Sequence, residues 1–179
     1  MKSISKDPLL TFARWGTVAA QIFLIFVQVV LGIAMAATAI AALGFVPDGV
    51  DLEGIDALDN GVMAAAALAM ALGLAALGLA TRFVVRLRQI IDTVGQGDPF
   101  VAENAVRLTH MAWLTLVGQC LMILAGICGG WINAHSDGDN FDLEMGVSLS
   151  GFLLSIILFI LARVFREGTR MRAELEGTV

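Results

Sequence analysis

Four long apolar stretches alternate with segments rich in charged and turn residues along this chain of 179 residues. A helix needs about 20 apolar residues to cross the hydrocarbon layer of a membrane, and the four stretches are close to that length or longer. The pattern predicts an all-α integral membrane protein, with one four-span domain over residues 1–179. The predicted transmembrane helices cover about residues 15–43, 61–81, 108–134 and 145–162.

Charged residues divide unevenly among the segments outside these spans. All eleven Lys and Arg residues lie in the N-terminal segment, the central connection (82–107) or the C-terminal tail (163–179). The loops 44–60 and 135–144 contain no Lys or Arg, but they hold nine Asp and Glu residues. Short loops rich in Lys and Arg stay on the cytoplasmic side of a membrane. Both termini and the central connection are therefore predicted to be cytoplasmic, and the two acidic loops to lie outside.

Composition agrees with a membrane protein, and the positions of the charged residues narrow the range of possible functions. Hydrophobic residues make up 58% of the chain and charged residues 15%, against about 45–50% and about 25% in soluble proteins. No predicted span contains Asp, Glu, Lys or Arg. Proton relays and ion-coupled carriers need such groups at depth, so the sequence disfavours a pump or coupled transporter. A small passive pore or carrier, built by oligomerisation, stays open as an alternative function.

The central connection contains a turn, GQGDP (residues 95–99), between two charged stretches with helical character. We expect the second helix to continue beyond the membrane until the glycines of this turn end it. Arg88 and Asp92 stand four positions apart on that helix and are expected to pair. Asp98 followed by Pro99 is typical of an N-cap and a first helical residue, so the next helix is predicted to begin there.

Two helix faces predict contacts. Small residues recur every four positions along the second span and favour close approach of another helix, from this chain or from a second copy in a homo-oligomer; they are Gly61, Ala65, Ala69 and Gly73. In the tail, five residues fall near one helical face; they are Val164, Phe165, Gly168, Met171 and Leu175. This spacing fits either an amphipathic helix on the membrane surface or a helical extension of the fourth span.

The remaining patterns offer little chemistry. In the loop HSDGDNFDLE (135–144), Asp137 and Asp139 match the first ligands of a calcium loop, but Phe141 and Asp142 stand where an oxygen ligand and a glycine are required. A phosphate-binding glycine loop, an HExxH motif and a serine nucleophile elbow are all missing from the sequence. We therefore expect no catalytic residue, cofactor, metal site or enzymatic activity. The lipid bilayer is the expected partner, and direct binding of nucleic acid is not expected.

A weak internal repeat relates the two halves of the chain. A shift of 98 positions aligns Trp15 with Trp113 and Gln21 with Gln119. Because both helical hairpins would start inside the cell, the repeat predicts two parallel-repeat hairpins. The alternative is that apolar helices match by chance.

Two segments carry a family resemblance. GDPFVAENAVRL (residues 97–108) and LARVFREGTRMRAELEGTV (residues 161–179) resemble the bacterial membrane family catalogued as domain of unknown function 2975. The four-span layout is similar over nearly the whole chain. The family has no established activity, and its members are often encoded beside small helix-turn-helix regulators of the Xre type. The resemblance thus implies a multi-pass protein of the bacterial inner membrane that is a partner or regulator of such a cytoplasmic protein.

The most specific part of this resemblance lies in the central connection. If that connection is a docking hairpin, its partner-binding residues are Asp98, Pro99, Phe100, Glu103, Asn104 and Arg107. Phe100 would then be the apolar anchor of the interface, and Arg107 would supply charge complementarity. The alternative is that Asp98 and Pro99 merely cap a helix, while Phe100 inserts among lipid headgroups and the arginines contact anionic lipid.

Overall fold

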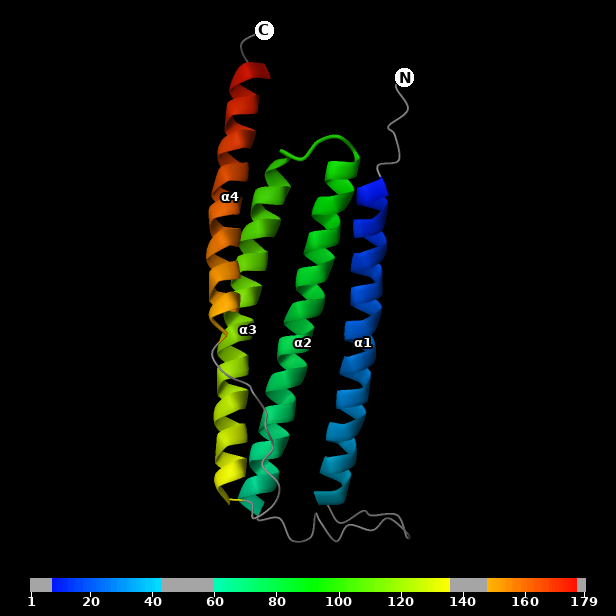
Figure 1. Cartoon of the computed structure of the whole chain (residues 1–179), viewed down its shortest axis with the longest axis vertical. Coiled ribbons are helices and arrows are strands. Elements are labelled where there is room, and N and C mark those ends of the chain that lie inside the picture. The colour runs from blue at the N-terminus through cyan, green and yellow to red at the C-terminus, as the bar shows by residue number, and fades with distance from the viewer. Residues whose placement is uncertain (1–7, 43–59, 136–147, 177–179) are drawn as a thin grey trace. The chain divides into compact units, whose positions relative to one another are not determined.

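The computed structural model describes residues 8–42, 60–135 and 148–176, and these form four α-helices (Figure 1). Each helix is long and apolar enough to cross a membrane. This confirms the predicted all-helical, multi-pass membrane class. The helices are α1 (Pro8–Ala42), α2 (Asn60–Gly95), α3 (Ala102–His135) and α4 (Leu149–Glu176).

Helix bounds differ from the predicted spans mainly by extension. α2 continues to Gly95 and α4 continues without a break to Glu176, so the tail is a helical extension of the fourth span, the second of the two alternatives above. At its other end, α4 begins at Leu149, because Ser148 is not helical. The acidic loops predicted to lie outside the cell fall almost wholly beyond the described residues, and the calcium-like segment after His135 falls entirely beyond them.

The chain divides into two compact units, each described here by itself. Unit 1 combines Met1–Ile25, Leu79–Val117 and Leu149–Val179. Unit 2 combines Phe26–Gly78 and Gly118–Ser148. Unit 1 therefore contains one end of α1, the end of α2, the start of α3 and all of α4, together with the connection between α2 and α3.

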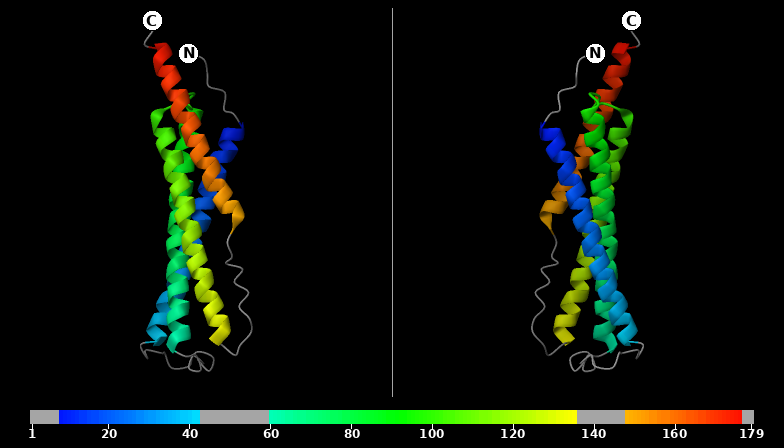
Figure 2. Two further views of the ribbon diagram at one scale, coloured as in Figure 1. Left: turned by 90° about the vertical axis from the view of Figure 1, so that its left-hand side faces the viewer. Right: turned by 90° about the vertical axis from the view of Figure 1, so that its right-hand side faces the viewer.

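The core of unit 1 lies between α3 and α4. It consists of Leu108, Met111 and Ala112 from α3 with Leu158 and Ala162 from α4. Partly buried side chains surround it, three from α2 and two from α4; they are Phe83, Leu87, Ile90, Phe159 and Phe165. Within this unit α4 crosses α2 and α3 obliquely (Figure 2). Small Ala112 and Ala162, both almost fully buried, allow the large side chains around them to interdigitate.

Two glycines of α2 lie against side chains of α1 in unit 2. A Cβ atom placed on Gly73 of α2 would lie 3.6 Å from Leu31 Cδ2 of α1, and one on Gly78 would lie 3.8 Å from Gln28 Nε2. Val62 and Ala125 are buried in the same unit. Glycine lets two helix backbones approach closely where apolar lipid supplies no hydrophobic driving force. The contact at Gly73 agrees with the small-residue stripe read from the sequence.

Many large apolar side chains of α1 are exposed rather than buried. Along α1, Phe12, Ile22, Phe23 and Ile33 are each more than three-fifths exposed, whereas Thr17 is buried and Gln21 and Gln28 are half-buried. A soluble helix shows the reverse arrangement. In lipid, apolar groups outside and polar groups against neighbouring helices are the expected order.

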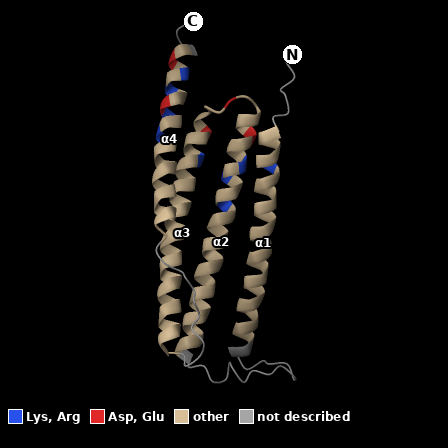
Figure 3. Cartoon of the chain, in the orientation of Figure 1, with Lys and Arg blue, Asp and Glu red and all other residues tan. Residues whose placement is uncertain are grey.

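Charged residues are restricted to unit 1 among the described residues. Figure 3 shows the Lys, Arg, Asp and Glu residues of α1, α2 and α3 on the turns nearest the α2–α3 connection, and those of α4 in its C-terminal half. The described part of unit 2 contains no Lys, Arg, Asp or Glu. Among the described residues, the charged groups that a partner or ligand could contact therefore lie in unit 1.

Candidate functional site: the connection between α2 and α3

The connection begins with a glycine that ends α2. Gly97 has a φ of 88°, in the left-handed region that favours glycine. Its N–H donates to the Val94 carbonyl at 3.0 Å, and the Asp98 N–H donates to the Thr93 carbonyl at 3.3 Å. These two bonds form a Schellman motif, which satisfies carbonyls left without partners at the helix end. The prediction that glycines end α2 is confirmed, with Gly97 as the residue that makes the turn.

The predicted start of α3 at Asp98 and Pro99 is wrong. α3 begins at Ala102, where the Asn104 N–H donates to the Val101 carbonyl at 3.0 Å. Residues 98–101 are not helical. Asp98 therefore does not act as the N-cap of α3. Its carboxylate, expected to cap α3, instead contacts a side chain from α4.

Asn104 joins the two sides of the connection. Its side chain is fully buried, and its Nδ2 donates to Thr93 Oγ1 at 2.8 Å and to the Pro99 carbonyl at 2.9 Å. Its Oδ1 accepts from Arg107 Nη1 at 2.7 Å. A buried amide without partners would be costly, and here three hydrogen bonds satisfy it while linking α2, the connection and α3. Asn104 is therefore a structural residue of the connection and is not accessible to a partner.

The C-terminal half of α4 lies directly on this connection. The rings of Phe100 and Phe165 are 5.4 Å apart between centroids. Thr169 Oγ1 donates to the Phe100 carbonyl at 3.3 Å, and Arg172 Nη1 lies 2.5 Å from Asp98 Oδ1. Residues 165, 169 and 172 follow the i, i+4, i+7 spacing of one helix face. One face of α4 thus covers Asp98 and Phe100 with an aromatic contact, a hydrogen bond and an ion pair.

Gly168 makes the close approach of α4 possible. A Cβ atom at this position would lie 2.9 Å from Phe100 Cδ1, a separation that real Cβ atoms essentially never show. A larger residue would therefore displace the Phe100 ring from its place against Phe165. Glycine usually weakens a helix interior, so its presence here is explained by the contact with Phe100.

This contact divides the apolar face predicted for the tail. Phe165 and Gly168 turn towards the connection, whereas Val164, Met171 and Leu175 are exposed. The sequence reasoning missed Phe165, Gly168, Thr169 and Arg172 as site residues. Their spacing at positions 165, 168, 169 and 172 was available as a signal, but the connection that they contact lies about 70 residues earlier in the chain.

The six residues predicted to bind a partner therefore have different surroundings. Asn104 is buried, Asp98 and Phe100 contact α4, and Pro99 supplies a carbonyl to Asn104. Arg107 is half-buried against Asn104, and Glu103 is exposed in the first turn of α3. Phe100 is 42% exposed despite its contact with Phe165. A partner would therefore meet the connection and α4 together.

An ion pair ties α1 to the same region of unit 1. Arg14 Nε lies 3.4 Å from Asp92 Oδ1. The intrahelical pair expected between Arg88 and Asp92 does not form among the described residues, since the Asp92 carboxylate is directed to α1 instead. Arg14 is exposed and Asp92 is half-buried, and ion pairs near the surface contribute little to stability. The main information from this ion pair is that α1 contacts α2 near Asp92.

The described helices hold no group of three or more His, Cys, Asp or Glu side chains arranged for a metal ion. Cys120 and Cys128 are free thiols.

Comparison with known proteins identifies the family. The chain belongs to the family described as Protein of unknown function (DUF2975), whose model matches residues 53–179. The match contains α2, α3, α4 and the whole connection but leaves out α1, so the resemblance, expected over nearly the whole chain, is shown for its last three helices. No curated protein and no solved structure matches the chain.

Proposed function

We propose that this member of the family is a non-enzymatic membrane protein that binds a small cytoplasmic protein. The binding surface consists of the α2–α3 connection (residues 96–101) and the α4 tail (residues 163–176), named here the composite surface. The proposed orientation, with both termini and the composite surface in the cytoplasm, is supported by the positions of the Lys and Arg residues. The partner proposed first is a small helix-turn-helix protein of the Xre type, as the family resemblance implies.

The observation that carries this proposal is the exposed apolar face of the α4 tail. Val164, Met171 and Leu175 are 56%, 53% and 72% exposed, and the helix that carries them extends past the connection (Figures 1 and 2). They follow the i, i+7, i+11 spacing of a single face. An amphipathic helix offers such a face to an apolar groove on a partner. This face is separate from the one that covers Phe100, so a partner and the connection do not compete for it.

Charges beside this face are held in place. Arg170 Nη2 lies 2.5 Å from Glu167 Oε1, and its Nε lies 3.6 Å from Glu174 Oε1. The pairs follow i,i+3 and i,i+4 spacing and are exposed, so their effect on stability is small. They keep three long side chains in an ordered row beside the apolar residues. Such a row supports orientation and rate of association more than affinity.

The contact of α4 with the connection makes the composite surface rigid before a partner arrives. Phe165, Thr169 and Arg172 hold the helix against Phe100 and Asp98. Binding to a surface that is already ordered costs less conformational entropy than binding to a flexible tail. The composite surface therefore supports docking better than an isolated loop would.

Membrane recruitment tests the proposal. The chain is co-expressed with a fluorescent Xre-type protein of the kind encoded beside family members, and the membrane-bound fraction is measured. Wild type should recruit the protein, and Met171→Glu with Leu175→Glu should lower recruitment at least about tenfold, because both side chains would enter an apolar interface. Arg166→Gln, at an exposed position on the same tail, is the matched control and should retain recruitment.

Absence of recruitment by wild type, or equal recruitment by the double variant at matched membrane levels, would overturn the proposal. The competing function is a passive pore or carrier formed by oligomers. Solute flux through liposomes containing wild-type protein, unchanged by the two glutamate substitutions, would favour that alternative.

A further inference from the structure

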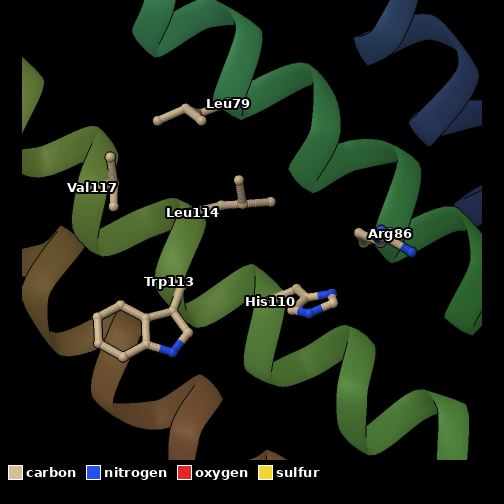
Figure 4. A pocket seen from close by; sticks show the side chains of 6 residues that line it. All are labelled: Leu79, Arg86, His110, Trp113, Leu114 and Val117. Carbon is tan, nitrogen blue, oxygen red and sulfur yellow. The ribbon is translucent and has the colours of Figure 1, made fainter.

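A pocket of about 250 Å³ lies between α2 and α3 in unit 1 (Figure 4). Two residues of α2 and four of α3 line it; they are Leu79, Arg86, His110, Trp113, Leu114 and Val117. The pocket is separate from the composite surface, since none of these residues belongs to the connection or the α4 tail.

The lining changes from polar to apolar along the pocket. Figure 4 shows Arg86 and His110 at one end and Leu79 and Val117 at the other. On each helix the polar and apolar residues are seven positions apart, which is about 10 Å along the axis. The polar end is the end nearer the connection on both helices, because α2 ends at Gly95 and α3 begins at Ala102. The apolar end is directed into the stretch of each helix that lacks charge.

Arg86 has hydrogen-bonding capacity left for a ligand. Its Nη1 donates to Gln89 Oε1 at 3.4 Å, a long bond that uses one of its five N–H donors. No carboxylate in the described part of the chain lies within ion-pair distance of it. Several other described arginines also have no ion pair, and Arg86 is the one among them that lines the pocket. A half-buried guanidinium without an acidic neighbour favours an anion in the pocket.

Trp113 places the pocket at a membrane boundary. Its indole packs edge-on against Phe159 of α4 at 5.5 Å and is 54% exposed. Tryptophan is enriched where hydrocarbon meets headgroups, because its ring is apolar and its N–H is a donor. Arg86 and His110 stand on the connection side of Trp113, and Val117 stands on the apolar side. The order of residues along the pocket therefore matches the order of a phospholipid, headgroup first and acyl chain second.

The geometry points to a binding site for one anionic phospholipid. Arg86 and His110 donate to the phosphate oxygens, and Leu79, Leu114 and Val117 contact the first part of an acyl chain. Basic pockets between transmembrane helices bind such headgroups in general. A free phosphate ion shares the charge chemistry but would leave the apolar half of the pocket without a partner, so the intact lipid is the expected occupant.

Lipid binding to the purified full chain in detergent tests this site. Bound lipid is counted by native mass spectrometry during titration with phosphatidylglycerol, phosphatidylcholine or inorganic phosphate. We expect one tightly held phosphatidylglycerol, weaker phosphatidylcholine, and no displacement of the lipid by millimolar phosphate. Arg86→Gln should raise the Kd for phosphatidylglycerol about tenfold through loss of charged hydrogen bonds, and His110→Gln should raise it less.

Arg82→Gln is the matched control, since Arg82 is an exposed arginine one turn earlier on α2 and does not line the pocket. Leu114→Gln tests the apolar half and should weaken lipid binding while leaving helical content unchanged by circular dichroism. Equal losses of lipid affinity for Arg82→Gln and Arg86→Gln would mean that general surface charge explains the binding. That result would overturn the proposed site. Equal binding of phosphatidylcholine, or displacement by phosphate alone, would overturn it as well.

Discussion

Unit 1 and unit 2 each contain parts of α1, α2 and α3, yet the contacts inside one unit differ in kind from those inside the other. Unit 1 combines large apolar side chains with directional polar contacts, as at Asn104, Arg14 and Arg172. Unit 2 has small residues at its helix contacts, with Gly73 against Leu31 and Gly78 against Gln28. The comparison shows which unit depends more on the identity of its side chains. Many sequences satisfy close packing of small residues in lipid, whereas the contacts of unit 1 require particular side chains at particular positions.

Within unit 1, substitution of Asn104 should have the largest effect on stability. Asn104→Ala should lower the free energy of unfolding in detergent by about 2–3 kcal/mol, because Thr93, Pro99 and Arg107 all lose a partner. Glu103→Ala, at the exposed neighbouring position, should change it by less than about 0.5 kcal/mol. Denaturant unfolding followed by circular dichroism measures both. Similar values for the two variants would show that the hydrogen bonds of Asn104 do not stabilise unit 1.

In unit 2 the sharpest test is overpacking of the small-residue stripe. Ala69→Leu should destabilise the protein by about 1–3 kcal/mol, because Ala69 is half-buried on the stripe that includes Gly73. Ala71→Leu adds the same side chain at an exposed position of α2 and should be nearly neutral. Thermal unfolding in detergent compares them. If Ala69→Leu proves as stable as Ala71→Leu, the stripe faces lipid rather than a helix.

Gly168 allows a test in which the sign of the effect changes. Gly168→Ala should cost about 1 kcal/mol in wild type, since its Cβ would displace the Phe100 ring. In a Phe100→Ala background the same change should stabilise by about 0.5–1 kcal/mol, as alanine normally does in a helix. A double-mutant cycle by denaturant unfolding gives both values. Additive effects would mean that Phe100 and Gly168 do not contact each other.

The smallest effect is expected for the exposed ion pair of the connection. Arg172→Gln should lower stability by about 0.2–1 kcal/mol at low salt and by less at high salt, because salt screens surface charges. Thermal unfolding at two ionic strengths, with Arg166→Gln as the control, measures it. A loss that does not depend on salt would show that Arg172 acts through packing and not through its charge.

The sequence predicts the helix contacts of unit 2 better than those of unit 1. Uninterrupted apolar residues predict the four helices, and small residues predict the contact at Gly73, because both signals are local in the chain. The cover of Phe100 by Phe165 and Gly168 joins segments about 70 residues apart, so no local pattern indicates it. The sequence predicts Asp98 to be a helix cap because Pro99 follows it, but in the structure its carboxylate pairs with Arg172 of α4. The internal repeat stays a prediction.

The central claim is that the composite surface of unit 1 faces the cytoplasm, and labelling of single cysteines tests it most directly. In a background without Cys120 and Cys128, one cysteine replaces Gln96, which is exposed at the turn after α2. Single cysteines at Asp51 and Asp139, in the acidic loops beyond the described residues, serve as references. We expect an impermeant reagent to label the two loop positions in intact cells and Gln96 only after the membrane is opened. Labelling of Gln96 in intact cells would contradict the account.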